Sequence, residues 1–165
     1  MIKVSSFSDI IVQDYPFAQN LKDEVVPLLE DYPDYQGRNT NIKATMTEWN
    51  WGSDIPQVTR FKGYVFNEIA KFAVCTFIWK NFWGNVYRKG DYGISHDHVP
   101  SYSSFVYFVK AKWYYSPLVF TDSGKKIRPK EGRLIIFPSY LKHHVPMHRY
   151  SEQRITLSGN LVYAA

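Results

Sequence analysis

Residues 83–110 read WGNVYRKGDYGISHDHVPSYSSFVYFVK, and this stretch decides the fold class. From Trp83 onward, short apolar or aromatic runs recur between breaks of Gly, Pro, Ser and Lys, which is the pattern of β-strands separated by turns. We expect strands over residues 83–88, 93–99, 103–110, 114–121, 126–129, 133–138, 143–148 and 154–163. Short strands at such regular spacing are typical of a sandwich, a barrel or a jelly roll.

The residues before this stretch favour helices. From Pro16, which suits a first helical turn, one apolar stripe has helical spacing and consists of Phe17, Leu21, Val25, Leu28 and Leu29. Pro27 is expected to kink or divide that helix. A second stripe predicts a helix that ends before Gly84, and it consists of Phe61, Val65, Ile69, Phe72 and Thr76. Because both apolar faces need a partner, we expect the helices to cover one outer face of the sheet.

Length and composition are those of one ordinary folded domain. The chain has 165 residues, of which 45% are hydrophobic and 21% charged. We therefore expect a single domain over residues 1–165, with a mainly helical part over 1–80 and a stranded core over 81–165. No apolar run approaches the roughly 20 residues that cross a bilayer, and the N-terminus lacks a secretory signal. The expectation is a cytoplasmic protein with no membrane partner. Cys75 is the only cysteine, which excludes a multi-cysteine zinc site.

Charge is distributed unevenly along the chain. Residues 1–40 hold 7 Asp and Glu against 3 Lys and Arg, whereas residues 41–165 hold 8 against 17. The densest basic stretch consists of Lys125, Lys126, Arg128, Lys130 and Arg133. A solvated loop is the favoured interpretation of this stretch, because charge alone is weak support for a nucleic-acid partner.

All five histidines lie in the stranded half, at positions 96, 98, 143, 144 and 148. Successive side chains of a strand alternate between its faces, so His96 and His98 are expected on one side and Asp97 on the other. Two imidazoles on one face can share a metal ion. A third ligand must come from another strand, and the adjacent His143 and His144 cannot both point inward from a regular strand.

Three ligands on one side of an ion leave positions open for small molecules, as an Fe(II) oxygenase needs for a chelating cosubstrate and O₂. The same three imidazoles also suit zinc with an activated water. A lone His-x-His is more often a pair of polar positions on a solvent-facing strand. The sequence that follows His98 favours the metal site over this alternative.

Three segments carry a resemblance to a known family. They are residues 83–98, from Trp83-Gly-Asn-Val-Tyr87 to His96-Asp-His98; residues 132–145, Gly-Arg-Leu-Ile-Ile-Phe-Pro-Ser-Tyr-Leu-Lys-His-His-Val; and residues 154–160, Arg-Ile-Thr-Leu-Ser-Gly-Asn. In order and spacing the chain resembles the phage and bacterial Fe(II)/2-oxoglutarate oxygenases of the prolyl-hydroxylase-like superfamily, over about residues 83 to 163. The resemblance implies an α+β fold: a double-stranded β-helix (cupin-like jelly roll) with the N-terminal helices outside its sheet.

The resemblance also implies the chemistry. Fe(II), 2-oxoglutarate and O₂ would together hydroxylate a C–H bond of a substrate, with release of succinate and CO₂. It selects His143 over His144 as the distal ligand, beside His96 and His98. A phage-encoded member would act in the host cytoplasm.

The proposed cosubstrate residues follow from the last matched segment and from Tyr87. A fixed guanidinium at Arg154 can grip the far carboxylate of a diacid with two charge-assisted hydrogen bonds. Thr156 and Ser158 share its face in a regular strand and offer hydroxyl donors. Tyr87 resembles the family tyrosine that reaches the cosubstrate. The plain alternatives are a surface arginine on an edge strand and an ordinary core aromatic.

One position departs from the family pattern, because His98 stands where the wider superfamily has Asp or Glu. A neutral imidazole in place of a carboxylate makes the site one unit more positive. Three hypotheses stay open: a working three-histidine iron centre, Asp97 as the ligand through a β-bulge, or a site for another metal without oxygenase activity.

Two other functional classes remain as alternatives: a cupin-like three-histidine metalloenzyme that does not use 2-oxoglutarate, and a non-catalytic jelly-roll binding module. Substrate contacts are expected on residues 101–104, on 113–116 and in the N-terminal half. A peptidyl proline is suggested by superfamily analogy alone. The aromatic residues Tyr102, Trp113 and Tyr114 equally suit a base, a sugar or a peptide ring.

Overall fold

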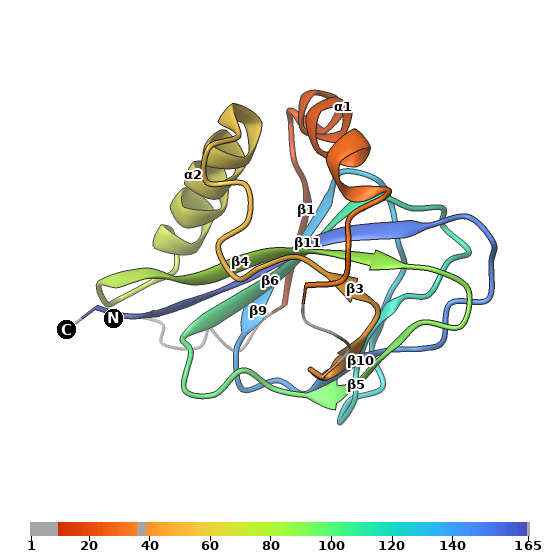
Figure 1. Cartoon of the computed structure of the whole chain (residues 1–165). Coiled ribbons are helices and arrows are strands. Elements are labelled where there is room, and N and C mark those ends of the chain that lie inside the picture. Colours follow the sequence, from red (N-terminus) through yellow and green to blue (C-terminus); the bar gives the residue numbers. More distant parts are fainter. Residues whose placement is uncertain (1–9, 36–38, 165) are drawn as a thin grey trace.

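The computed structural model describes residues 10–35 and 39–164, which form two facing antiparallel sheets with helices outside one of them (Figure 1). The six-stranded sheet has the order β1 (Ile11–Asp14), β9 (Arg133–Pro138), β6 (Ser103–Lys110), β11 (Arg154–Tyr163), β4 (Phe77–Tyr87) and β3 (Thr45–Met46). The five-stranded sheet has the order β2 (Ile42–Lys43), β5 (Tyr92–His96), β10 (His143–Val145), β7 (Leu118–Phe120) and β8 (Lys126–Ile127). This is the jelly roll that the sequence predicts.

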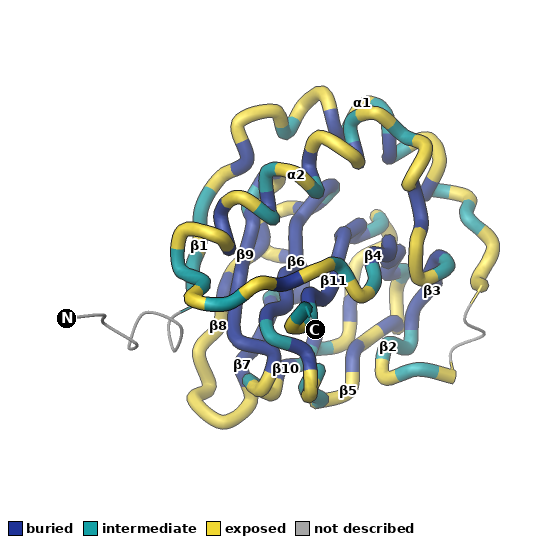
Figure 2. Tube along the Cα trace, turned by 90° about the vertical axis from the view of Figure 1, so that its left-hand side faces the viewer, coloured by how far each residue is buried: buried dark blue, intermediate teal, exposed yellow. Residues whose placement is uncertain are grey.

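The central strands of the six-stranded sheet are buried on both faces. Along β6, Phe105 and Tyr107 pack toward the helices, whereas Val106 and Phe108 pack toward the second sheet. Strand β9 alternates in the same way, and Figure 2 shows these strands in the colour of buried residues. Because a strand turns successive side chains to opposite faces, both faces of the sheet are apolar here. One core therefore lies between helices and sheet, and a second lies between the sheets.

Two helices cover the outer face of the six-stranded sheet, on the side away from β5 and β10 (Figure 1). Helix α1 (Ala18–Leu29) buries Leu21, Val25 and Leu29. It continues across Pro27 and ends two residues later, so the proline does not divide it. Helix α2 (Pro56–Ala70) begins at a proline in its first turn. No helix in the described part of the chain is long and apolar enough to cross a membrane.

The prediction that the second helix extends to Gly84 is wrong. Helix α2 ends at Ala70, and the aromatic run from Phe77 to Phe82 is the first half of the long strand β4. This half pairs with the end of β11, where Tyr163 faces Phe77 and Gly159 faces Phe82. The helical spacing of Phe72 and Thr76 is therefore accidental. Pairing with a strand some eighty residues away decides the conformation.

Other boundaries differ at the ends of short strands. Strands β6, β9 and β11 have the predicted bounds, whereas β5, β7, β8 and β10 are shorter than predicted. Strands β1, β2 and β3 were not predicted, so the part before residue 80 is less helical than expected. Strand β5 ends at His96, and His98 therefore lies beyond the strand rather than on its face.

Candidate metal centre

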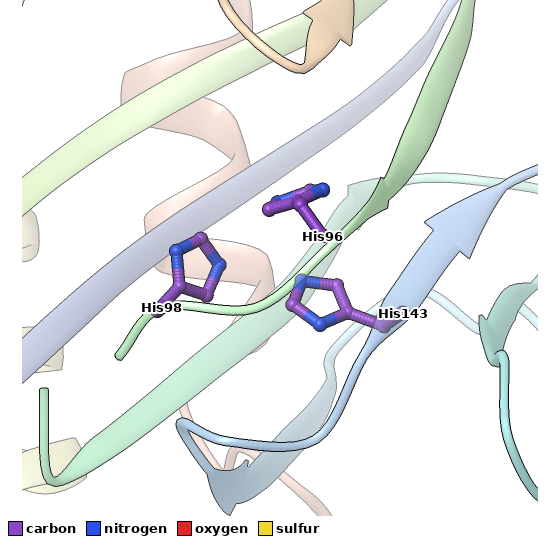
Figure 3. A group of neighbouring side chains, drawn as sticks. All are labelled: His96, His98 and His143. Atoms are coloured by element: carbon purple, nitrogen blue, oxygen red, sulfur yellow. The ribbon is translucent and has the colours of Figure 1, made fainter. Parts of the chain in front are cut away.

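Three imidazoles from two neighbouring strands and one loop come together in the five-stranded sheet (Figure 3). His96 at the end of β5 pairs with His143 at the start of β10 in the antiparallel ladder. His98 follows β5 by two residues, and its backbone N–H donates to the carbonyl of Ser139 over 2.8 Å. Ser101 N–H in turn donates to the carbonyl of His98 over 2.8 Å. Backbone hydrogen bonds thus hold all three positions.

The rings are close enough for one ion. One ligand nitrogen from each of His96, His98 and His143 lies within 4.8 Å of the other two. The ring centroids are 4.5 Å apart for His96 and His143, 4.9 Å for His96 and His98, and 5.0 Å for His98 and His143. The nitrogens would have to move closer together for one ion to bind all three at the bond length of about 2.1 Å that zinc forms with imidazole.

Hydrogen bonds at the other ring nitrogen orient two of the three imidazoles. Nδ1 of His96 is 2.6 Å from the carbonyl of Ile94, and Nδ1 of His143 is 2.9 Å from the carbonyl of Leu141. A carbonyl oxygen can only accept, so both Nδ1 atoms carry the proton. Nε2 of each ring therefore has its lone pair free to bind a metal.

Burial keeps these imidazoles neutral. It lowers the pKa of His98 to about 2, with the neighbouring His143, His96 and Lys80 charges adding to the effect. It lowers the pKa of His143 to about 4, with His96 adding to the effect. The pKa of His96 is lowered as well, again by burial. Metal ions bind the neutral form of histidine, so the cluster has the protonation state that a ligand set needs.

The other candidate ligands lie outside the cluster. The Asp97 carboxylate accepts the backbone N–H of Val99 over 3.1 Å and closes its own turn. His144 has its Nδ1 atom 2.9 Å from the hydroxyl of Thr121. His148 is fully buried in the loop after β10, where its Nε2 atom lies 2.7 Å from the carbonyl of Glu152. The structure brings together His96, His98 and His143 and leaves these three aside.

A cavity adjoins the histidines, and Arg154, the first residue of β11, also lines it. Arg154 faces Tyr87 across the β11–β4 ladder and is 1% exposed. Its Nε atom donates to the carbonyl of Ser116 over 2.9 Å, and its Cζ atom lies 4.6 Å from the ring centroid of Tyr87 and 5.1 Å from that of Phe108. Nη1 and Nη2 are buried without a hydrogen-bond partner among the described residues.

Thr156 and Ser158 line the same cavity, as their alternation with Ile155 and Leu157 predicts. The side chain of Asn85 donates to both hydroxyl oxygens over 3.2 Å. Asn85 lies in the matched segment 83–98, but its residue type and position in the sequence predict no role for it. Its signal is its register opposite Thr156, which only the strand pairing reveals.

These features fit 2-oxoglutarate. A buried guanidinium with two free donor nitrogens needs an anion, since an unpaired buried charge is costly. A carboxylate accepts two parallel N–H donors from one guanidinium. Because His96, His98 and His143 line the same cavity, Arg154 would hold the carboxylate at one end of such a molecule and a metal would hold the chelating oxo-acid at the other. Arg154, Thr156, Ser158 and Tyr87 are the residues that would hold it.

On the other side of the histidines lies an open cleft of about 230 Å³. His96, His98, Ile42 and Trp83 line both spaces, so the metal centre lies where they meet. The remaining lining of the cleft consists of Thr40, Asn41, Met46, Trp49, Lys80, Asn81, Asp97, Val99, Ser101 and Asn160. The Ser101 hydroxyl is buried and has no hydrogen-bond partner in the described part of the chain.

Some of the residues expected to contact a substrate line the cleft, and others do not. Ser101 and several N-terminal residues line the cleft, whereas Tyr102 packs against Phe77 and Tyr163. Trp113 and Tyr114 are exposed and line neither space. The basic stretch also lies apart: Lys130 pairs with Asp14 over 2.5 Å, and no residue of this stretch lines either space in the part of the chain that the structure describes.

Comparisons with known proteins agree with this geometry. The family model described as "Putative 2OG-Fe(II) oxygenase" matches residues 121–160, which include His143, Arg154, Thr156 and Ser158. No curated protein sequence matches the chain. The solved structures below are similar in fold.

The viral collagen prolyl hydroxylase of Paramecium Bursaria Chlorella virus-1 is 12% identical, with a TM-score of 0.76 over 96% of this chain and 98% of that one. A Pseudomonas putida prolyl-4-hydroxylase is 16% identical, with a TM-score of 0.77 over 99% and 97%. HygX from Streptomyces hygroscopicus, solved with nickel and 2-oxoglutarate bound, is 9% identical, with a TM-score of 0.72 over 98% and 85%.

The jelly roll and the resemblance that the sequence predicts are thus confirmed, the first by the solved structures and the second by the family model. The chain has the fold of the 2-oxoglutarate- and Fe(II)-dependent oxygenases and, over residues 121–160, matches a sequence model of that family.

Proposed function

We propose that this protein is an Fe(II)- and 2-oxoglutarate-dependent oxygenase whose metal ligands are His96, His98 and His143. The observation that carries the proposal is the buried guanidinium of Arg154, whose two unpartnered nitrogens lie in a cavity that the three imidazoles also line. When bound, Fe(II) and 2-oxoglutarate supply the activation of O₂ and the hydroxylation of a C–H bond, with release of succinate and CO₂.

The protein residues hold and orient the reactants. His96 and His143 present Nε2 because their Nδ1 protons are bound to backbone carbonyls. Arg154, Thr156 and Ser158 hold the distal carboxylate of the cosubstrate at the far end of the cavity. Burial raises the pKa of Tyr87, against the opposing effect of the Arg154 charge, so this side chain remains a neutral phenol beside the guanidinium.

With His98 as a ligand, the site is one charge unit more positive than with a carboxylate in its place. Three neutral imidazoles leave the full charge of a divalent ion uncompensated by protein. The two carboxylates of 2-oxoglutarate would offset the ion at one end and Arg154 at the other. A cupin-like enzyme without 2-oxoglutarate, or a binding module without a metal, gives no reason for an arginine buried without an anion.

The substrate would enter the 230 Å³ cleft, because that space opens on the opposite side of the histidines from Arg154. Two of the structures with this fold are prolyl hydroxylases by name, and on that analogy we propose a peptide substrate. The amide side chain of Asn41 along the cleft suits hydrogen bonds to a peptide backbone, whereas the buried Asn160 already donates to Asn81 and accepts from Ser104.

The test is a titration of the anaerobic Fe(II)-loaded protein with 2-oxoglutarate, monitored by the visible absorption of the Fe(II)–2-oxoglutarate complex. The wild-type protein is expected to develop this band, and Arg154→Ala is expected to need far more cosubstrate. A candidate peptide is then tested by mass spectrometry for the gain of one oxygen atom. Iron binding without any response to 2-oxoglutarate would overturn the proposal in favour of the cupin-like enzyme, and no metal binding would favour the binding module.

A further inference from the structure

A hydrogen-bonded chain links the wall of the cleft to the cosubstrate cavity. The indole Nε1 of Trp83 donates to Oδ1 of Asn85 over 2.9 Å. Nδ2 of Asn85 donates to Thr156 Oγ1 and to Ser158 Oγ, each over 3.2 Å. Trp83 and Asn85 lie on β4 opposite Ser158 and Thr156 of β11, and all four side chains are buried.

The donor-only indole determines which way the amide of Asn85 points. An indole N–H cannot accept, so its partner must be the amide oxygen rather than the NH₂ group. The NH₂ group then faces the two hydroxyls with both of its hydrogens. A flipped amide would place two donors against each other at Trp83. The orientation therefore follows from hydrogen-bonding chemistry.

This arrangement determines the role of the two hydroxyls. Each hydroxyl oxygen accepts a hydrogen bond from Asn85, so its own O–H is left to donate elsewhere. Neither Thr156 nor Ser158 has another hydrogen-bond partner among the described residues. Both hydroxyls line the cavity that contains the unpartnered Nη1 and Nη2 of Arg154. Four donors thus serve one small cavity.

We propose that Asn85 is a positioning residue for the distal carboxylate of 2-oxoglutarate: held by the indole of Trp83, it leaves the Thr156 and Ser158 hydroxyls to donate to that carboxylate. The inference rests on the proposed function and extends it, since Asn85 itself acts through the two hydroxyls. The inference also gives Trp83 a second role. The ring of Trp83 lines the cleft, and its centroid lies 5.0 Å from that of Trp49. Its N–H orients Asn85 and, through Asn85, the two hydroxyl donors on the cosubstrate side.

The experiment compares two ligands by calorimetry on the Ni(II)-loaded protein, which binds without turnover. 2-Oxoglutarate and 2-oxopentanoate share the chelating oxo-acid end, but only the first has a distal carboxylate. Asn85→Ala is expected to lower the affinity for 2-oxoglutarate about tenfold, the effect of one weakened hydrogen bond to a charged group. The affinity for 2-oxopentanoate is expected to stay unchanged.

Two further variants sharpen the test. Asn85→Asp offers only acceptors, so both hydroxyls turn their protons toward it and a negative charge faces the ligand; its loss of 2-oxoglutarate affinity is expected to exceed that of Asn85→Ala. Trp83→Phe keeps a ring but frees the amide, and a smaller selective loss is expected.

The matched control is Thr47→Val, which removes the buried hydrogen bond from Gly84 N–H beside the same strand but lies outside the cavity. It is expected to lower the melting temperature and to leave both affinities unchanged. An equal loss of both ligands in Asn85→Ala, or no loss of either, would overturn the inference while leaving the proposed function intact. Failure of the wild-type protein to bind 2-oxoglutarate would overturn both.

Discussion

His96 and His143 face each other across the β5–β10 ladder, and their ring centroids are 4.5 Å apart. Each Nδ1 atom is bound to the carbonyl two residues earlier in the chain, Ile94 for His96 and Leu141 for His143. The strand pairing therefore sets the distance between the two imidazoles, and the local carbonyls set their tautomers. His98 completes the set from the loop that follows β5.

The first prediction concerns the ligand set. His143→Ala is expected to lower the affinity for Ni(II) on the order of 100-fold. Loss of a residue that only hydrogen-bonds a metal ligand can already cost that much. Isothermal titration of the metal-free protein measures this affinity. Asp97→Asn is the control, because that carboxylate accepts the N–H of Val99 and lies outside the cluster of three imidazoles, and this variant should still bind metal. If Asp97→Asn loses the metal and His98→Ala does not, the assignment of His98 is wrong.

Replacing His98 by a carboxylate tests whether that position is a ligand at all. His98→Asp keeps a donor atom and makes the site one charge unit less positive, whereas His98→Ala removes the donor. We expect His98→Asp to retain Fe(II) binding and His98→Ala to lose most of it, as measured anaerobically. Equal loss in both variants would mean that His98 serves the structure of the loop rather than the metal.

Acid is expected to destabilise the metal-free protein. The pKa of His143 falls from 6.5 to about 4 on burial. Between these values the unfolded chain binds a proton that the folded chain does not, so the free energy of unfolding decreases as the pH falls. Urea unfolding in the presence of a chelator, from pH 7 down to pH 4, measures the decrease. His143→Gln should give a shallower pH dependence, and an unchanged slope in this variant would contradict the assigned shift.

Arg154 is expected to lower the free energy of unfolding of the metal-free protein, although it contributes to the binding of 2-oxoglutarate. The residue is 1% exposed, and two of its guanidinium nitrogens have no hydrogen-bond partner among the residues that the structure describes. Arg154→Met fills similar space without a charge, so the free energy of unfolding should rise by about 1 kcal/mol or more. The same variant should lose nearly all affinity for 2-oxoglutarate. Arg128→Met, at an exposed arginine, should change neither quantity. A less stable Arg154→Met protein would show that the guanidinium is satisfied within the fold.

Two glycines give stability predictions of opposite sign. A Cβ atom on Gly159 would lie 2.7 Å from Phe105 Cε1 and 2.8 Å from the carbonyl oxygen of Asn81, so Gly159→Ala should destabilise the fold by about 1–3 kcal/mol. A Cβ atom on Gly63, inside α2, meets nothing within 4 Å, so Gly63→Ala should stabilise it by about 0.5–1 kcal/mol. Urea unfolding checks both, and a neutral Gly159→Ala would contradict the tight packing of β11.

The sequence predicts the fold best where local pattern and tertiary environment agree. Strands β6, β9 and β11 have their predicted bounds because short apolar or aromatic runs end there at breaks in the pattern. The first half of β4 was mistaken for helix because Phe72 and Thr76 fall at helical spacing by accident. Its partner is the end of β11, and no local pattern carries a pairing over that distance. Strands of two residues, such as β2 and β3, have no period to detect.

The residues of the candidate site also fall into those that the sequence predicts and those that it does not. Histidines and an arginine are rare enough in strands that their spacing and the family resemblance pointed to them. Asn85 and Trp83 were missed because a buried asparagine and a core tryptophan have no sequence signature of their own. The bond from Asn85 to Thr156 spans 71 positions and depends on strand register. Residues that orient others are therefore visible only after the sheet is assembled.

The unequal anchoring of the three imidazoles bears on how an ion would escape. Withdrawing His96 or His143 requires the ladder between β5 and β10 to open, whereas His98 lies on a loop held by single backbone hydrogen bonds. Loop openings of this kind cost less free energy than opening a buried strand pair. Loss of the ion would therefore begin at His98. The dissociation rate of the ion would follow the motion of that loop rather than the stability of the two sheets.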